Sequence, residues 1–582
     1  MSVQRGFAMI AILALIAMIS AFLIASALNR TAADTSNERE DRSMSALRKA
    51  KAALIAYAAN EQWQYYKNPP PPPLTNTGYF QPGALPSPDM DDDGDANFVW
   101  GSNTASMIGR LPFKTLGIDD LRDASGERLW YALSHDFRKL RCSVGTVPPN
   151  CTVINSDTQG QLTVIGNAPA TQVVAVLFAP GEAFQSQIRD PGNAIAHNDP
   201  LNYLEGPPNL SDPVNYVFTT APPSTTFNDR VLVITKAELM DAVEPVVAAN
   251  IERDIKPFVQ DYFTKWGAYP FAMTFAAPPA SVTDYKGTSG QTQGLLPLTD
   301  DPNWFKWAFA TVMQVPPGTG SPTVTSWNCS INSSPLQAVC HVDYCCTSND
   351  RPDIKIEVFL QNANRAFADI PSPITAPENF TITKNGGGFV SNQGSPYGQF
   401  SDVGSVAPFT DFATQTAVVA QTGVIIYTGR LQNAASMNGG VTITIPLPTP
   451  KYLPIVSGDP VVNPNGSWFV SNQWYRDAYY AVSPGYVSGG VPWGSSATCS
   501  PLPATPSCLT ANNLTAPTND KRAIIVLAGR QLNGTNRPAS GNPADYFENA
   551  NLSAANSTVP FVYEHRAGVP TSINDRVVVV SP

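Results

Sequence analysis

The chain has 582 residues, a formal net charge of -10 and a charged fraction of only 14%. This acidic balance leaves no basic stripe, so nucleic acid is excluded as an expected partner. A hydrophobic fraction of 43% excludes intrinsic disorder, while 54 prolines and 40 glycines favour β-rich structure with long loops. A chain of this length is expected to fold into two or three domains.

The amino terminus begins with a short leader, residues 1–6, which contains Arg5. Residues 7–28 then form an apolar run without a charged side chain, long enough for a helix to cross the roughly 30 Å hydrocarbon core of a membrane. Residues 34–67 contain neither proline nor glycine, so this helix is expected to continue into a polar segment. That segment carries an apolar stripe at helical spacing, ready to pack on a sheet: Leu47, Ala50, Leu54, Tyr57 and Ala58. The pattern predicts a long transmembrane helix at the amino terminus.

The sequence Arg5-Gly6-Phe7 and the apolar run behind it resemble the start of a type IV prepilin. The resemblance implies that a prepilin peptidase cuts between Gly6 and Phe7, that the new amino terminus is methylated, and that the apolar run forms the filament core. Major pilins carry a glutamate at the fifth residue after the cut, where this chain has Ala11. Its absence resembles minor subunits that start or cap a filament. The core positions implied are Phe7, Ala11, Leu15, Phe22 and Leu28.

Two other interpretations of this segment stay open. It is either a cleaved secretory signal ending near Ala25-Ser26-Ala27, or an uncut signal anchor. The eight cysteines favour an oxidising compartment for the large domain. We therefore expect a single pass through the inner membrane with a periplasmic ectodomain, and an extracellular or envelope filament after assembly.

An acidic loop follows the polar helix. Its carboxylates alternate, and Gly94 stands at the sixth place, as at the start of a calcium loop. The twelfth place is Trp100, where an EF-hand has a bidentate glutamate, so a solvated acidic turn is the competing interpretation. Calcium is the one cofactor that the sequence suggests, and its expected ligands are Asp89, Asp91, Asp93 and Asp95.

A turn and an aromatic strand come next. Asp123 and Gly126 precede Trp130-Tyr131, and this order resembles the Asp-Pro-Trp-Gly turn and following strand of pseudopilins. The match is partial because Ala124 and Ser125 occupy the middle of the turn. In physical terms, Asp and Gly favour the turn, and the aromatic residues favour a half-buried strand.

Several segments of the first half return in the same order in the second half, which indicates an internal duplication. The pairs are Trp130–Ser134 with Tyr479–Ser483, Cys142 and Cys151 with Cys499 and Cys508, Val174–Ala179 with Ile524–Gly529, Asn202–Glu205 with Asp545–Glu548, and Asn228–Ile234 with Asn574–Val580. Gly109–Phe113 also resembles Gly294–Leu298.

The second copy is predicted to begin with its own helix. Thr235 and Glu238 form a capping-box pattern, and Pro245 and Pro257 are expected to kink the helix. The predicted fold is α+β, with two duplicated pilin-like modules that each pack a helix on an antiparallel sheet. The predicted divisions are leader 1–6, membrane or filament-core helix 7–28, first module 29–234, and second module 235–582 with a β-rich insertion at 305–468.

The repeated cysteine pairs, Cys142 with Cys151 and Cys499 with Cys508, predict two local disulfides. The other four cysteines surround His341 and fit either a zinc site or two further disulfides. In the disulfide interpretation, Cys345 and Cys346 are expected to bond to Cys329 and Cys340 rather than to each other.

No catalytic residues are predicted, and the chain is not expected to be an enzyme. Ser134-His135-Asp136 has the residue types of a triad, but adjacent side chains cannot build its geometry. The resemblance implies a minor pilin or pseudopilin of a type IV pilus or type II secretion pseudopilus, near the tip, with roles in assembly or adhesion. Its expected partners are the prepilin peptidase, other pilin subunits, the inner membrane and a surface ligand. The alternatives are a signal-anchored binding protein outside any filament and an exported hydrolase.

Overall fold

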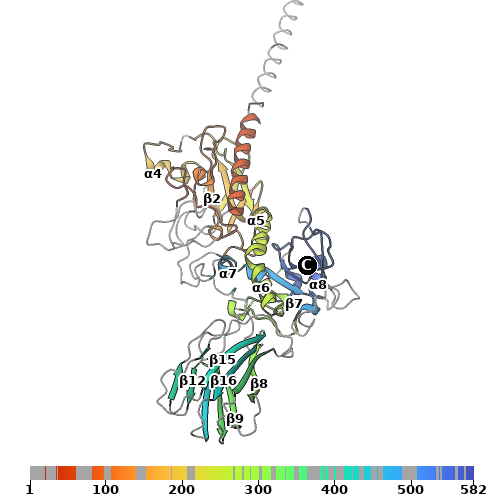
Figure 1. Cartoon of the computed structure of the whole chain (residues 1–582). Helices are drawn as coiled ribbons and strands as arrows, with labels where there is room; N and C mark the ends of the chain where they lie inside the picture. The colour runs from red at the N-terminus through yellow and green to blue at the C-terminus, as the bar shows by residue number, and fades with distance from the viewer. Residues whose placement is uncertain are drawn as a thin grey trace, which may run out of the picture. The chain divides into compact units, whose positions relative to one another are not determined.

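The structure of the chain is a computed structural model. By their contacts, the residues form two compact units, Met1–Val247 and Ala248–Pro582, each described separately below (Figure 1). The described residues are 20, 34–60 except 36, 81–97, 107–138, 153–205 except 185, 216–266, 269–299 except 278, 280 and 289, 305–315, 323–345 except 335, 353–362, 381–384, 387–390, 399–400, 412–421, 424–431, 438–446, 455, 463, 465–487, 508–532, 537, 540–556, 561–568 and 572–582.

The expected transmembrane helix requires a correction. Within the described residues, no helix is both long enough and apolar enough to cross a membrane. The helix of residues 37–59 is too polar, because charged side chains occupy every position of 38–42. This finding contradicts two predictions, the long membrane-spanning helix and the single-pass location in the inner membrane. Apart from Ser20, residues 7–28 lie outside the described part of the chain.

The first unit is built on a six-stranded sheet. Four antiparallel strands lie in the order β1-β2-β4-β6, and β3 and β5 extend the sheet from the first half of β4. Because β3 and β5 are parallel, the sheet is mixed, which corrects the expected purely antiparallel one. The strands are β1 (Ile108–Arg110), β2 (Trp130–Leu133), β3 (Leu162–Gly166), β4 (Ala170–Ala179), β5 (Val217–Thr220) and β6 (Arg230–Thr235).

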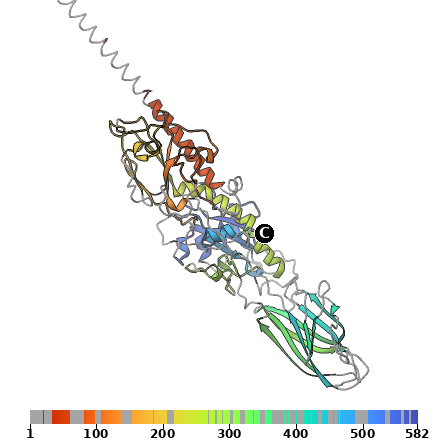
Figure 2. The same ribbon diagram turned by 90° about the vertical axis from the view of Figure 1, so that its left-hand side faces the viewer.

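The helix of residues 37–59 covers one face of this sheet, as the red helix beside the strands shows in Figure 2. Lys51 Nζ donates a hydrogen bond to the backbone oxygen of Val233 in β6 at 2.8 Å. Ser43 Oγ accepts one from the backbone amide of Ala124 at 3.1 Å. The predicted apolar stripe forms the buried side of the helix, and its members are Leu47, Ala50, Leu54, Tyr57 and Ala58.

The second unit contains a sheet of the same design. Its strands follow the order β7-β18-β20-β22, and every neighbouring pair is antiparallel. Strands β19 and β21 form a separate parallel pair. The strands are β7 (Gln293–Leu295), β18 (Ala478–Val482), β19 (Thr510–Asn512), β20 (Ala523–Leu527), β21 (Val562–Glu564) and β22 (Arg576–Ser581).

The repeated sequence segments lie on equivalent strands of the two sheets. Tyr131 of β2 lies opposite Leu177 of β4, and its counterpart Tyr480 of β18 lies opposite Ile525 of β20. Leu177 is thus equivalent to Ile525. The comparison of the repeated segments in the sequence instead matches Leu177 with Leu527, two residues later. The apolar residues of β20 are too alike for sequence matching to fix their register.

A helical segment follows β6. Thr235 Oγ1 accepts a hydrogen bond from the Glu238 amide at 3.3 Å, and Glu238 Oε2 accepts one from the Thr235 amide at 3.0 Å, so the capping box forms. Instead of one kinked helix, there are α5 (Lys236–Asn250), the π-helix η3 (Ile251–Ile255) and α6 (Lys256–Trp266). Pro257 has no amide hydrogen for residue 253, and the wider π-turn precedes it.

The β-rich insertion consists of two five-stranded antiparallel sheets, which lie against each other in Figures 1 and 2. Their strand orders are β13-β12-β17-β10-β9 and β14-β15-β16-β11-β8. The strands are β8 (Phe305–Val315), β9 (Thr323–Ser333), β10 (Leu336–Cys345), β11 (Asp353–Asn362), β12 (Thr381–Lys384), β13 (Gly387–Val390), β14 (Gln399–Phe400), β15 (Phe412–Gln421), β16 (Val424–Leu431) and β17 (Asn438–Pro446).

Short helices connect the strands of both units. The short helices are α3 (Phe113–Leu116), η1 (His135–Phe137), α4 (Ala194–His197), η2 (Pro200–Asn202), η4 (Val282–Asp284), α7 (Ser467–Ser471), η6 (Trp474–Asp477), η7 (Pro484–Tyr486), η8 (Pro543–Asp545) and α8 (Asn549–Ala555).

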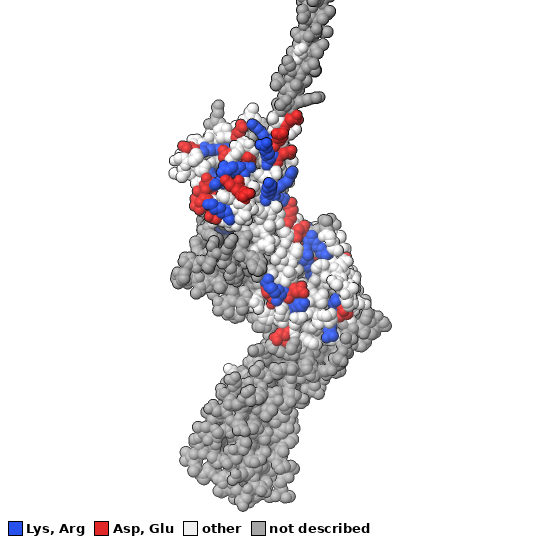
Figure 3. Space-filling view, turned by 45° about the horizontal axis from the view of Figure 1, so that its top comes forward, with Lys and Arg blue, Asp and Glu red and all other residues white. Residues whose placement is uncertain are grey.

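In the space-filling view, basic and acidic side chains are interspersed on the described surface that faces the viewer (Figure 3).

The packing of the first helix on its sheet predicts the effect of a cavity. Leu54→Ala removes a side chain with no exposed surface and is expected to lower the free energy of unfolding of the first unit by about 2–5 kcal/mol. Urea unfolding, with hydrogen exchange of the β2 and β4 amides as the local readout, measures this loss. Arg48→Ala on the exposed side of the same helix is the control, with an expected change within about 0.5 kcal/mol. Equal losses of stability in Leu54→Ala and Arg48→Ala would contradict the packing of this helix on the sheet.

Candidate functional site

The acidic loop is joined to the edge of the first sheet. The Asp89 amide donates to the Arg110 backbone oxygen at 2.9 Å, and the Arg110 amide donates to the Asp89 oxygen at 2.7 Å. A Cβ at Gly109 would lie 2.4 Å from the Asp89 oxygen, so only glycine allows this approach. The second unit has the same close backbone approach, because Met273 pairs with Leu295 beside Gly294.

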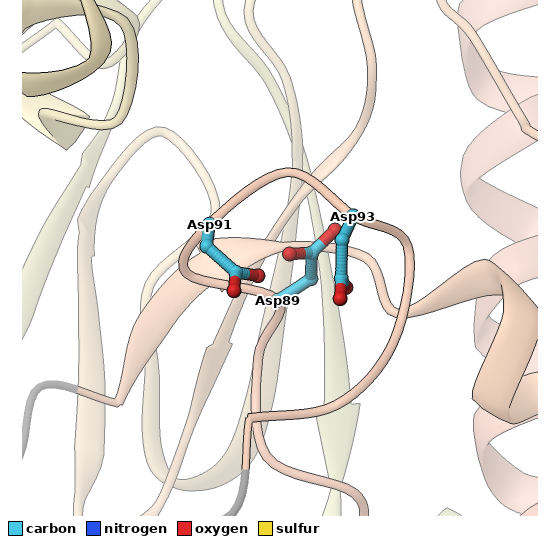
Figure 4. A group of neighbouring side chains, drawn as sticks. All are labelled: Asp89, Asp91 and Asp93. Carbon is cyan, nitrogen blue, oxygen red and sulfur yellow. The ribbon is translucent and has the colours of Figure 1, made fainter.

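Asp89 is buried at the base of the loop (Figure 4). Its Oδ1 accepts the Asp92 amide and its Oδ2 accepts the Gly94 amide, both at 2.8 Å. Burial raises the pKa of Asp89 to about 6, and the neighbouring Asp91 and Asp92 act in the same direction. The two amide hydrogen bonds favour the ionised form and oppose this rise.

Three of the four expected calcium ligands converge. One carboxylate oxygen from each of Asp89, Asp91 and Asp93 lies within 4.8 Å of the others, and Figure 4 shows the three side chains around one turn of the loop. Asp95 is not in this group, and its carboxylate accepts a hydrogen bond from Thr115 Oγ1 at 3.4 Å. Three carboxylates suit a hard cation such as calcium. The calcium site stays a prediction with three protein ligands.

Asp92 faces a different set of groups. Its Oδ1 lies 3.1 Å from Arg110 Nε and also pairs with Arg128, while its Oδ2 lies 3.0 Å from His197 Nε2. Burial alone would raise the pKa of Asp92, but the hydrogen bond with His197 and the charges of both arginines outweigh it and lower that pKa. The side chain is therefore held as a carboxylate, and it ties the loop to the sheet and to α4.

Arg110 is the centre of this network. Only 2% of the residue is exposed, and its guanidinium lies 5.1 Å from the ring centroid of Trp130 and 5.3 Å from that of Tyr203. It donates to Asn198 Oδ1 and to the His197 backbone oxygen, both at 2.7 Å. It also donates to the Tyr203 hydroxyl at 3.2 Å, so the buried cation has a carboxylate, two aromatic faces and three neutral acceptors as partners.

Sequence reasoning missed these basic residues, although one signal was present. Arg189 lies 4.7 Å from the ring centroid of Tyr203, and Arg537 lies 4.6 Å from that of Tyr546 in the second unit. Each arginine precedes one copy of the repeated turn that contains the tyrosine. A repeated arginine could therefore have been read from the duplication, whereas Arg110 has no such repeat.

The turn predicted from Asp123 and Gly126 is formed. Asp123 Oδ1 accepts the amides of Ser125 and Glu127 at 2.8 and 3.0 Å, and Gly126 has a φ of +86°. Asp123 Oδ2 accepts the Gly181 amide at 2.8 Å, which connects the turn to the end of β4. The role of Asp123 in this structure is therefore to hold a turn.

The cysteine cluster requires a correction. Cys329 and Cys340 are bonded to each other, not to Cys345 and Cys346. They are directly opposite in the β9–β10 hairpin, with a Cα–Cα distance of 4.1 Å, so their side chains lie on the same face of the sheet. Both sulfurs are used in the disulfide and are not available as thiolate ligands for zinc.

The remaining predicted site residues are less informative. Cys508 is disulfide-bonded. Cys345 lies in β10. The predicted leader, filament-core and cysteine positions outside the described residues are Gly6, Phe7, Ala11, Leu15, Phe22, Leu28, Cys142, Cys151, Cys346 and Cys499.

Comparison of the chain with protein-family models, with curated proteins and with solved structures finds no match to any of them.

The geometry around Arg110 predicts that replacing it with lysine lowers the stability of the first unit. Arg110→Lys keeps the charge but loses the planar group that contacts Trp130 and reaches several acceptors, so we expect a loss of about 1–3 kcal/mol in the free energy of unfolding. Urea unfolding checks this value. Arg122→Lys, at a half-exposed arginine paired with Asp120, is the matched control with little expected change. Equal stability of the two variants would contradict the assigned role.

The converging carboxylates predict stabilisation by calcium. About 1 mM calcium is expected to raise the melting temperature of the first unit, and the rise should weaken below about pH 6, where Asp89 takes up a proton. Scanning calorimetry with calcium and with chelator measures it. Asp91→Asn and Asp93→Asn should remove the effect, while Asp95→Asn should retain it. An identical melting curve with calcium and with chelator would contradict the site.

Proposed function

We propose that the chain is a pilin-like minor subunit of a type IV pilus or type II secretion pseudopilus, placed at or near the tip of the filament. The observation that carries this proposal is the repeated order of a helix followed by antiparallel strands, β1-β2-β4-β6 and then β7-β18-β20-β22. A helix packed on such a sheet resembles the globular part of a pilin. The leader Arg5-Gly6-Phe7 supports the same assignment from an independent part of the sequence.

The position near the tip has two supports. Ala11 stands where a major pilin has the glutamate that pairs with a neighbouring amino terminus, so insertion beneath an existing subunit is disfavoured. The second unit also carries two additional five-stranded sheets that the repeated module does not need for its own core. Extra sheets of this size suit contact with a surface ligand. In this proposal, the partners are the prepilin peptidase and other pilin or pseudopilin subunits.

The experiment that tests the proposal is the mass of the mature amino-terminal peptide, compared between cells with and without their prepilin peptidase. A peptide that begins at Phe7, is N-methylated and disappears without the peptidase is the expected result. A peptide that begins near Leu28 would contradict the filament assignment. An intact leader in both strains would also contradict it and would favour a binding protein outside any filament.

A variant pair strengthens this test. Gly6→Val places a branched side chain at the bond that the peptidase would cut and is expected to retain the leader. Ser2→Ala, within the same leader, is the matched control and should be processed normally. Normal processing of Gly6→Val would contradict cleavage at this bond.

A further inference from the structure

Each unit has a buried aspartate beside a partly buried glutamate at the corner where the last strand of its sheet begins. In the first unit, Glu205 follows η2, and Asp229 directly precedes β6. In the second unit, Glu548 follows η8, and Asp575 directly precedes β22. Both pairs lie in repeated segments, so the arrangement occurs twice in one chain.

The first pair is closely connected through the backbone. Asp229 Oδ2 accepts the Glu205 amide at 2.8 Å, while Glu205 Oε2 accepts the amides of Asn228 and Asp229 at 3.0 and 3.1 Å. Only 3% of Asp229 is exposed, and among the described residues no donor faces its buried Oδ1. The Glu205 carboxyl group lies within hydrogen-bond reach of Asp229. One proton between the two groups would complete this set of hydrogen bonds.

The charged neighbours of the first pair do not neutralise both acids. Arg189 is the nearby cation, but its guanidinium donates to the backbone oxygens of Gly181 and Asn202, each at 2.8 Å, and pairs with Glu127 at 3.4 Å. Burial, and then the charge of Glu205, raise the pKa of Asp229 well above its ordinary value, and Arg189 offsets only part of this.

In the second pair, Asp575 is also buried, and a side-chain amide takes part in its hydrogen bonds. Asp575 accepts the Gly529 amide at 3.3 Å and Asn551 Nδ2 at 2.9 Å. Arg537 is the nearby cation, but it pairs with the buried Asp477 at 2.6 Å and donates to the Gly529 oxygen. Burial, and then the charge of Glu548, raise the pKa of Asp575 well above its ordinary value.

The corner itself is also the same in the two units. A Cβ at Gly181 would lie 2.8 Å from Asn228, and one at Gly529 would lie 2.4 Å from Asn574. Each asparagine donates to a neighbouring backbone oxygen, that of Glu182 or that of Arg530. Two units that differ elsewhere have thus retained the acid pair, the arginine and the tight corner together.

We propose that Glu205 and Asp229 share one proton in the folded protein, as do Glu548 and Asp575, and that each pair acts as a proton-dependent latch on the last strand of its sheet. Loss of the shared proton would leave two negative charges in one buried corner. The corner and strand β6 or β22 would then be held less tightly, without unfolding of the whole unit.

The direction of the pH effect follows from proton linkage. A carboxyl group whose pKa is higher in the folded than in the unfolded protein binds more protons when folded. Its stabilising effect is fully present below the pKa of the unfolded chain, about 4, and is lost as the pH rises through the higher folded value. The latch should therefore hold best in acid and weaken toward alkaline pH, opposite to the behaviour of an ordinary ion-paired aspartate.

The test is hydrogen exchange of the full chain, measured by mass spectrometry on the peptides that cover β6 and β22, with intrinsic rates divided out. Between about pH 5 and about pH 8, the protection of β6 in the native chain should fall about tenfold or more, which corresponds to one unit of pKa difference. Asp229→Asn supplies an N–H in place of the shared proton, and β6 protection in this variant should change little over the same range. Glu205→Gln should behave in the same way.

Two controls separate the latch from a general charge effect. Asp190→Asn removes one negative charge at an exposed turn of the first unit and should leave the pH dependence of β6 unchanged. Glu548→Gln should flatten the response of β22 but not that of β6. Constant β6 protection in the native chain would overturn the proposal. So would an Asp229→Asn variant that loses protection equally at both pH values, because the side chain would then have only a structural role.

Discussion

Both units depend on a central strand that is buried on both faces. Every residue from Val173 to Ala179 in β4 is buried, as is all of β20. Such a strand needs a cover on each side. A helix covers one face of β4, where Tyr57 approaches Tyr131. Loops cover the other face, where Tyr203 packs on Trp130 with ring centroids 4.7 Å apart. The alternation of Trp130 and Tyr131 along β2 assigns one aromatic ring to each cover.

A cover made of loops brings polar backbone groups into the interior, and each of them requires a partner. The buried side chains of this layer meet that requirement. Arg189 and Arg537 donate to backbone oxygens of Gly181 and Gly529, and Asp123 accepts a backbone amide. Burying these charges costs free energy, which is offset because each has several partners in place. The charged residues under the loops are thus a consequence of covering a sheet with irregular chain.

The sequence was sufficient for features set by local pattern and by repetition. The apolar stripe of the first helix, the capping box at Thr235 and the turn at Asp123 depend on neighbours within a few residues, and each is found in the structure. The repeats also identified the equivalent strands. Features that depend on register were predicted less well. The pairing of Cys329 with Cys340 follows from their opposite positions in a hairpin, and spacing along the chain does not reveal it.

The candidate site was only partly predictable for a related reason. The acidic loop is a local pattern, but Arg110 and its partner Tyr203 are brought together only by the fold. The duplication shows what that arginine adds. Its counterpart in the second unit is Leu295, which pairs with Met273 as Arg110 pairs with Asp89. There, Phe275 lies 5.3 Å from the ring centroid of Tyr546 and 6.2 Å from that of Tyr479, so an aromatic cluster covers the face.

At the position of Arg110, the sheet is therefore covered by an apolar cluster in the second unit and by a charged network in the first. The apolar version is sufficient for the fold, and replacing a buried ion network by packed apolar groups is commonly neutral or stabilising. The network of Arg110, Asp92 and His197 is then not a requirement of the module. It fixes the conformation of the acidic loop that carries Asp89, Asp91 and Asp93. A costly feature present in one copy and replaced in the other therefore serves the conformation of this loop and not the repeated framework.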